Sequence, residues 1–138
     1  KDGTKKYPYV IHRTSLGCYE RTLALLIEKY AGAFPTWLAP TQVKLMPIMD
    51  ENVEYAKTIL DKMIDMGIRA EMDDRNEKIG YKIREAQLEK IPYMLIIGDK
   101  EMEAGTVAVR SRKEGDKGTM DTNAFISMLQ EEVAKKIN

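Results

Sequence analysis

Hydrophobic and polar residues alternate along the chain with two spacings, one typical of strands and the other of amphipathic helices. A short apolar run predicts a strand over Val43–Ile48, and alternation of apolar and charged residues predicts a second strand over Ile68–Met72. The run Met94–Ile97 within Pro92–Gly98 is typical of a central strand that is buried on both faces. Helical spacing predicts helices over residues 16–30, 51–66 and 79–90, and after Asp121. Because strands alternate with helices, we expect a largely parallel sheet with right-handed crossovers.

Each predicted helix carries an apolar stripe that would pack against the sheet. The stripes are Leu16, Leu23, Ile27 and Tyr30 in the first helix, Val53, Ala56, Leu60, Met63 and Ile64 in the second, Ile79, Ile83 and Ala86 in the third, and Phe125, Met128, Leu129 and Val133 in the last. Asp50 and Asp121 are suited to cap helix N-termini, and Gly67 is suited to a C-terminal cap.

Two further segments extend the predicted sheet. Tyr7–His12 is rich in residues that favour strands, and Thr106–Ser111 alternates between apolar and polar residues. Because Thr106 follows the central strand closely, we expect an antiparallel strand at one edge, and Gly115–Gly118 is interpreted as a turn. The prediction is an α/β fold with a mixed, mostly parallel sheet of about five strands flanked by helices.

The composition favours a folded chain and restricts how it could bind a nucleic acid. Of the 138 residues, 43% are hydrophobic and 32% are charged, which is typical of a globular domain. The 22 basic and 22 acidic residues leave no formal net charge, and this argues against a non-specific nucleic-acid binder. Any RNA binding must therefore depend on where individual charges are placed.

The same composition suggests a cellular setting. Cys18 is the single cysteine, so an internal disulfide is excluded and a reducing, cytoplasmic location is expected. No apolar run is long enough to span a bilayer, so we expect no membrane partner. The chain begins at Lys1 and not at a methionine, and it has no charged start followed by an apolar block that would indicate a signal peptide. We therefore interpret it as a piece of a longer protein.

The segment from Asp73 to Lys90 is the richest in candidate chemistry. It contains a possible stacking surface in Tyr81 and five basic side chains that could neutralise phosphates, namely Arg75, Lys78, Lys82, Arg84 and Lys90. A plainer interpretation stays open, because Asp74 and Glu77 have the spacing of a capping box and the charged residues could be solvated helix-face groups.

Near the N-terminus, Val10–Arg13, Gly17 and the pair Glu20-Arg21 precede a long apolar helix. On composition alone this is a surface helix with a Glu-Arg pair, and His12, the only histidine, is a surface or partly buried polar residue. With these flanking residues, however, the segment resembles motif three of class II aminoacyl-tRNA synthetases. The arrangement differs mildly from the common pattern of that motif at Ser15 and Cys18.

The resemblance to threonyl-tRNA synthetases extends over nearly the whole chain. The segments that carry it are 31–40, 73–86, 90–101 and 105–110. Related anticodon-binding domains serve prolyl-, histidyl- and glycyl-tRNA synthetases, but the form Arg-Asn-Glu-Lys-Ile-Gly-Tyr-Lys over residues 75–82 favours the threonyl branch. The resemblance implies that residues 1–33 are the C-terminal remnant of a class II catalytic domain and that residues 34–138 form an anticodon-binding domain.

This resemblance also implies roles for individual residues. Those that would contact anticodon bases are Asn76, Arg84, Glu101 and Arg110, with Lys78 as a companion on the RNA backbone. Without the resemblance, Glu101 would be a turn carboxylate and Arg110 a charge that protects a sheet edge. The implied partners are tRNA-Thr, through its anticodon loop, and the catalytic domain of the same protein, which is a homodimer when whole.

Two residues resemble parts of the catalytic machinery of the whole synthetase. Arg21 matches an arginine that contacts ATP, and His12 matches one of three zinc ligands. The other two ligands lie upstream in the family, so we expect no cofactor in this chain alone, and zinc and ATP-magnesium only in the whole enzyme. We therefore expect this chain to bind tRNA without catalysing threonine activation or transfer.

Two functions of other classes stay open. The chain could be a synthetase-like domain reused as a non-catalytic interaction or regulatory subunit, in which case it would bind different tRNAs equally. It could also be a small doubly wound enzyme or nucleotide binder, which would place a ligand at the carboxyl ends of the strands. The sequence contains neither a G-x-G-x-x-G motif nor a P-loop, which argues against the nucleotide binder.

Overall fold

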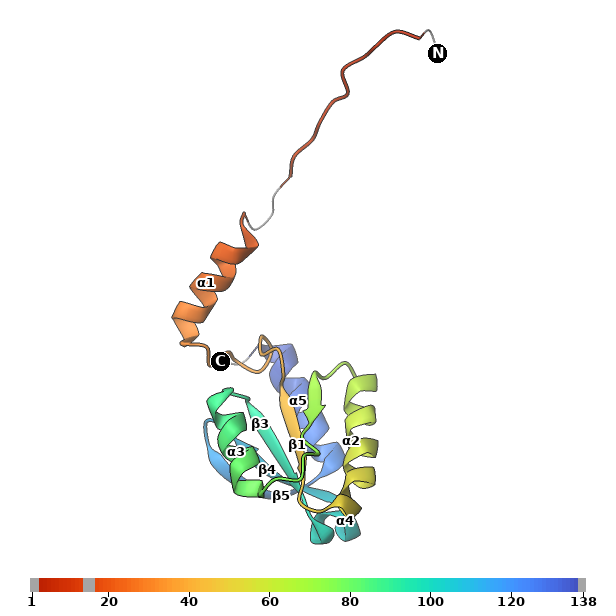
Figure 1. The fold of residues 1–138 in the computed structure, drawn as a ribbon, viewed down its shortest axis with the longest axis vertical. Helices are drawn as coiled ribbons and strands as arrows, with labels where there is room; N and C mark the ends of the chain where they lie inside the picture. Colours follow the sequence, from red (N-terminus) through yellow and green to blue (C-terminus); the bar gives the residue numbers. More distant parts are fainter. Residues whose placement is uncertain (1–2, 14–16, 137–138) are drawn as a thin grey trace.

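The computed structural model describes residues 3–13 and 17–136, and within them five strands form one sheet (Figure 1). The strands are β1 (Val43–Pro47), β2 (Ala70–Met72), β3 (Tyr93–Ile97), β4 (Thr106–Ser111) and β5 (Gly115–Asp121). The helices are α1 (Tyr19–Tyr30), α2 (Val53–Asp65), α3 (Ile79–Leu88), α4 (Asp99–Ala104) and α5 (Thr122–Lys135), and a 3-10 turn, η1 (Asp50–Asn52), precedes α2.

The sheet has the order β2-β1-β3-β4-β5 and mixes two kinds of pairing. β1 lies between β2 and β3 and pairs with both in parallel, so the two crossovers contain α2 and α3. β4 pairs antiparallel with β3, and β5 pairs antiparallel with β4. The predicted α/β class and mixed five-stranded sheet are therefore confirmed.

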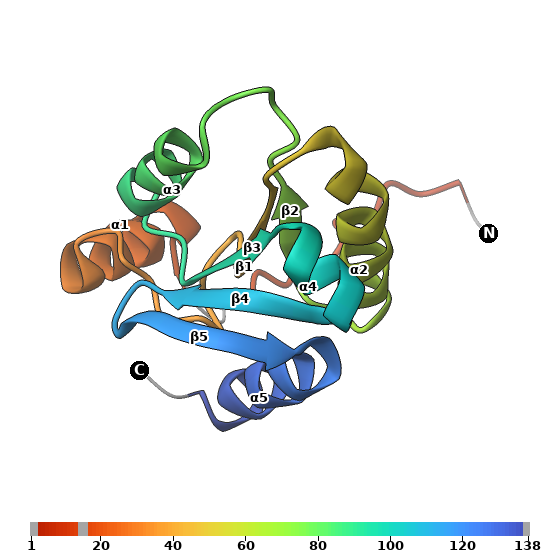
Figure 2. The ribbon, with the colours of Figure 1, turned by 90° about the horizontal axis from the view of Figure 1, so that it is seen from below.

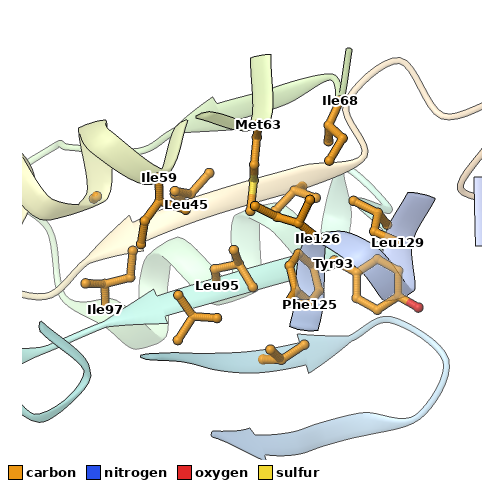
Figure 3. Close-up of a cluster of buried hydrophobic side chains, with 14 residues drawn as sticks. Leu45, Ile59, Met63, Ile68, Tyr93, Leu95, Ile97, Phe125, Ile126 and Leu129 are labelled. Carbon is orange, nitrogen blue, oxygen red and sulfur yellow. The ribbon is translucent and has the colours of Figure 1, made fainter. Parts of the chain in front are cut away.

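The larger core lies between the sheet and the helices α2 and α5. Alternate residues of β1, β3 and β4 point to this side because successive side chains of a strand face opposite ways. Figure 3 shows ten labelled members of this core, and among them Phe125 and Tyr93 meet edge to face with ring centroids 5.6 Å apart. Phe125, Leu95 and Leu129 are fully buried.

Helix α3 packs on the opposite side of the sheet. Figure 2 shows α3 and α5 on opposite sides of the sheet. Met46 of β1 and Met94 of β3 are fully buried there against Ala86 of α3, with Ile91 beside them. This smaller core leaves the part of that face over β4 and β5 without a helix above it.

Several local predictions are confirmed. Asp121 caps α5, since its carboxylate accepts from the backbone N–H groups of Asn123 and Ala124. Gly67 follows the C-terminus of α2 with a left-handed φ of 76°, a conformation that glycine adopts without a steric penalty. Of the stripe predicted on α2, Ala56 and Met63 are buried.

Other predictions are wrong. Residues 7–12 form no strand and are exposed, because no described strand lies beside them to complete the backbone hydrogen bonds. Gly115–Gly118 belongs to β5, where a register shift opposite Val109 and Arg110 accommodates an extra residue. Asp50 begins the 3-10 turn η1 and does not cap α2, and Ile64 is 52% exposed.

The first helix differs from its prediction in packing. It begins at Tyr19, and Leu16, the first residue of the predicted stripe, lies outside the described residues. α1 buries none of its residues, and Leu23 and Ile27 are about half exposed. No helix within residues 3–13 and 17–136 has the length and apolar character needed to cross a membrane.

Candidate nucleic-acid interface

Three loops meet at the edge of the sheet where the parallel strands end. They are residues 73–78 after β2, residues 48–52 after β1, and the turn from Gly98 to Glu101 after β3. They share one edge because β1, β2 and β3 run in the same direction. In Figure 1 this edge is the lower end of the sheet, where α3 and α4 begin. It is the edge where α/β sheets commonly bind ligands.

The loop of residues 73–78 is held by ionic hydrogen bonds around Asp73. Arg75 donates to Oδ1 of Asp73 from Nε at 2.8 Å and to Oδ2 from its guanidinium at 2.6 Å, and the same guanidinium also pairs with Glu85 of α3. These bonds lower the pKa of the Asp73 carboxyl below its usual value and raise the pKa of Arg75. Arg75 is thus engaged within the chain.

Lys82 is not the solvated or phosphate-binding group that the sequence suggested. Only 3% of it is exposed, and its ammonium donates to the carbonyl oxygens of Pro47 at 3.1 Å and Asp73 at 2.9 Å. Lys90 is also bonded internally, to the Ala31 carbonyl. Of the five basic side chains that the sequence grouped together, only Lys78 and Arg84 have no such partner within the described parts of the chain.

The loop before α3 presents its remaining polar groups to solvent. Asn76, Lys78 and Arg84 are exposed. Asp74 and Glu77 form no capping box, because α3 has Lys78 at its N-cap and no side-chain cap there. Tyr81 is about half exposed, and its hydroxyl bonds to Glu85, which raises the pKa of that phenol. A polar, partly aromatic surface therefore lies along the start of α3.

Arg110 lies on the same side of the sheet as α3. Its partner across β3 is Met94, which packs against Ala86 of α3, and partner side chains in a strand pair share a face. Arg110 is half-buried and sits at the register shift of β4, opposite Asp116 of β5. Arg110 therefore lies on the α3 side of the sheet, beside the start of β3.

Glu101 is a helix-capping carboxylate in α4, a helix that the sequence interpretation missed. Its Oε2 accepts from the Gly98 backbone N–H at 3.1 Å, so one oxygen is used to begin the helix. This arrangement is similar to the turn carboxylate that the sequence alone suggested for Glu101. The turn is compact, because a Cβ added at Gly98 would come within 3.1 Å of both Glu101 and Ile48.

The five candidate contacts come from separate elements. Asn76 and Lys78 lie on the loop after β2, Glu101 in the first turn of α4, Arg84 on α3, and Arg110 on β4 beside the start of β3. Sequence reasoning missed Asn52, a fully buried amide that joins two loops of the carboxyl edge. Its burial could not be read from spacing, because it follows exposed Asp50 and Glu51 in a polar run.

The two residues that resemble parts of the catalytic machinery, His12 and Arg21, lie outside the elements that carry these five residues. His12 and Arg21 are both exposed, the first in a segment without regular structure and the second on α1. Cys18 donates to Glu20 from Sγ at 2.8 Å. Within residues 3–13 and 17–136, no three His, Cys, Asp or Glu side chains are grouped so that they could hold a metal ion. The donors that the described residues offer around His12 therefore do not fit a zinc site.

A pocket of about 420 Å³ lies on the other side of the domain, between α5 and the β4–β5 hairpin. It is lined by Tyr93, Ser111, Lys113, Glu114, Lys117, Met128, Glu131, Glu132 and Lys135. Its charges neutralise one another in part, since Lys117 pairs with Glu114 and Lys135 pairs with Glu131. It shares no residue with the five candidate contacts.

The fold is an α/β domain with polar loops at the carboxyl edge of its sheet, and comparison with known proteins identifies its family. The family model for the anticodon binding domain matches residues 42–132. The chain therefore belongs to the anticodon-binding domain family.

The proteins that this chain resembles include threonine–tRNA ligases. The chain is 54% identical over all 138 residues to a threonine–tRNA ligase of Clostridium perfringens, of which it covers 22%, and 58% identical over 137 residues, 99% of the chain, to one of Clostridium botulinum, of which it also covers 22%. It thus spans about a fifth of the length of these relatives. A crystal structure of the RNA-binding domain of threonyl-tRNA synthetase from Cryptosporidium parvum superimposes with a TM-score of 0.77 at 31% identity, over 81% of this chain and 28% of that one.

Proposed function

We propose that this chain binds tRNA-Thr by recognising its anticodon loop, through a surface called here the anticodon face. The anticodon face consists of Asn76, Lys78, Arg84, Glu101 and Arg110. The observation that supports it best is that the exposed side chains of Lys78 and Arg84 have no bonding partner in the described chain, whereas the side chains of neighbouring Arg75, Lys82 and Lys90 are bonded internally. In an anticodon-binding domain, such uncommitted groups are suited to RNA.

The chemistry of each group suits an unpaired loop, whose bases can turn outward and present their Watson–Crick edges. Asn76 offers both a donor and an acceptor, and the guanidinium forks of Arg84 and Arg110 match a guanine edge or a phosphate. Glu101 retains one oxygen beyond its helix-capping bond and can accept from a base N–H. Lys78 is suited to a phosphate as a point charge.

The charge distribution supports recognition by local contacts. The formal net charge is zero, so no global field draws RNA to the chain. Only Lys78, Arg84 and Arg110 of the anticodon face are cationic, so about three phosphates at most are neutralised, and log Kobs should fall with log salt with a slope of about −2 or shallower.

We also propose that the chain acts as part of a threonine–tRNA ligase that activates threonine with ATP and transfers it to tRNA. The support is the similarity over the full chain to proteins with that name. In that whole enzyme the partner of this chain would be the catalytic domain, with ATP-magnesium, zinc and a homodimeric, cytoplasmic setting. The purified chain alone should transfer no threonine to tRNA in a radiolabel assay, and a tRNA-dependent signal would contradict this.

Single substitutions test the anticodon face. Asn76→Ala and Arg84→Ala should each weaken binding to a threonine-tRNA anticodon stem-loop by at least about fivefold, the loss of one good base contact. Lys57→Ala removes an exposed positive charge from α2, which packs on the side of the sheet opposite α3, and is the matched control. Arg84→Lys keeps the charge but loses the fork, so it should lose base preference more than affinity. Equal losses for Arg84→Ala and Lys57→Ala would contradict the proposal.

A further inference from the structure

Lys82 occupies an unusual position for a lysine. It lies on the buried side of α3 with 3% of its surface exposed, although lysine is almost never fully buried unless it is paired. Its ammonium donates to two backbone carbonyl oxygens, those of Asp73 at 2.9 Å and Pro47 at 3.1 Å. The first carbonyl begins the loop after β2, and the second ends β1. One buried side chain thus joins α3 to the ends of two neighbouring strands.

Asp73 completes this arrangement from the other side. It is 5% exposed, its backbone N–H donates to the Leu45 carbonyl at 2.8 Å, and its carboxylate receives Arg75. The nearby Lys82 charge also favours the ionised Asp73 carboxyl, after the larger effect of Arg75, and contributes to its lowered pKa. The first residue of the 73–78 loop is therefore held through its N–H, its carbonyl and its side chain.

From these contacts we propose that Lys82 and Asp73 are positioning residues for anticodon reading, and that neither touches RNA. This inference rests on the proposed function. The loop carries Asn76 and Lys78, whose exposed side chains have no bonding partner among the described residues, so their positions depend on the bonds that hold the rest of the loop, including those of Arg75 to Asp73 and Glu85. Asp73 fixes the start of the loop, and the first turn of α3 fixes its end. Asn76 is therefore ordered before RNA binds. Binding then requires less ordering of the chain.

Lys44 supplies a matched control, because it is another lysine between the sheet and α3. Its ammonium pairs with Glu89 at 2.6 Å, just beyond the C-terminal end of α3. Lys44 lines a pocket with Asp73, Asp74 and Arg75, but its ammonium forms no hydrogen bond or ion pair with the described residues of the 73–78 loop. Replacing Lys44 removes the same charge from the same layer and leaves the loop bonds intact. Any effect of charge alone on RNA affinity should therefore appear equally in Lys44→Met and Lys82→Met.

The experiment combines two measurements on Lys82→Met, Asp73→Asn and Lys44→Met. The first is amide hydrogen exchange of residues 74–78 in the chain without RNA, which reports loop order whether or not the anticodon is read. We expect exchange there to rise by on the order of tenfold in Lys82→Met and less in Asp73→Asn, with α2 and α5 unchanged. The second is the affinity ratio for native and altered anticodon stem-loops, which should fall at least about fivefold for Lys82→Met and stay unchanged for Lys44→Met.

The outcomes separate the two proposals. Faster exchange in the loop together with a lost affinity ratio supports positioning, whereas an unchanged ratio in a folded Lys82→Met chain overturns it. If Lys82→Met does not fold, Asp73→Asn decides, since it keeps the size of the side chain and the Lys82 bond to the carbonyl. An unaltered chain that shows no preference among anticodons would refute the proposed function, and with it the anticodon role of Lys82, while exchange would still show whether Lys82 orders the loop.

Discussion

Asn52 donates a hydrogen bond of 2.9 Å from Nδ2 to Oδ1 of Asp99, and this bond ties the turn after β1 to the first turn of α4. Asn52 is fully buried, and its Oδ1 accepts from the Met49 backbone N–H at 3.2 Å. Glu101 lies in the same turn of α4 as Asp99. The place of Glu101 at the carboxyl edge therefore depends on a buried amide from a different loop.

Replacing that amide should destabilise the domain. Asn52→Ala removes the partner of the Met49 N–H and of Asp99, and a buried polar group left without a partner costs about 1–3 kcal/mol. Urea unfolding followed by circular dichroism measures the loss. Asn123→Ala is the control, because this exposed amide bonds only to Lys62 by its side chain and its loss should change stability by no more than about 0.5 kcal/mol. Equal losses in the two variants would show that the Asn52 bonds contribute little.

The larger core should be most sensitive at Phe125. This ring is fully buried and meets Tyr93 edge to face, so Phe125→Ala should lower the free energy of unfolding by about 3–5 kcal/mol. Leu88, on α3, is 73% exposed, and Leu88→Ala should cost no more than about 0.5 kcal/mol. Chemical denaturation compares the two variants, and a loss below about 1 kcal/mol for Phe125→Ala would contradict the packing described here.

The Asp73–Arg75 pair should make stability depend on acid pH. Bonding to Arg75 lowers the pKa of Asp73 in the folded chain, so this carboxylate stabilises the fold above its unfolded pKa of about 3.9. The contribution is lost as pH falls through the lower, folded pKa. Asp73→Asn should therefore flatten the fall in stability below about pH 4 and lower stability at pH 7. Unfolding curves from pH 2 to pH 7 test this, and parallel curves for the two chains would refute it.

The N-terminal segment should be dispensable for the stability of the rest. α1 buries none of its residues, and it exposes Tyr19, Leu23, Leu25 and Ile27. The predicted domain boundary at residue 33 can be examined by removing residues 1–33. We expect Tm to change by less than about 4 °C, which corresponds to under 1 kcal/mol, and binding of a hydrophobic dye to fall. A larger fall in Tm would place α1 within the domain.

The sequence predicted the elements whose evidence is local. The apolar run of β3 and the side-chain cap of Asp121 each depend on residues close together in the chain, and both were found. The predicted turn at Gly115–Gly118 is part of β5, and the sequence does not indicate this strand because Met120 is the only large apolar residue among its seven. α4 was missed because its six residues are too few to show a helical stripe.

The candidate site was predicted by resemblance and corrected by packing. The sequence could place Lys78, Lys82 and Arg84 on one segment, but it could not show that Lys82 alone turns inward. Its partners are carbonyl groups of Pro47 and Asp73, and backbone carbonyls carry no sequence signal. The same holds for Asn52, whose partner Asp99 lies on another loop. These hydrogen bonds join segments that are far apart in the sequence and come together only when the sheet has formed.

The most direct test of anticodon recognition is the binding of the unaltered chain to a threonine-tRNA anticodon stem-loop and to one with altered anticodon bases, across a salt series. We expect the native loop to bind more tightly by at least about fivefold, with the preference retained at moderate salt. Weak binding that is equal for both loops and disappears as salt rises would contradict it, and would favour a synthetase-like domain reused for interactions that do not depend on the anticodon.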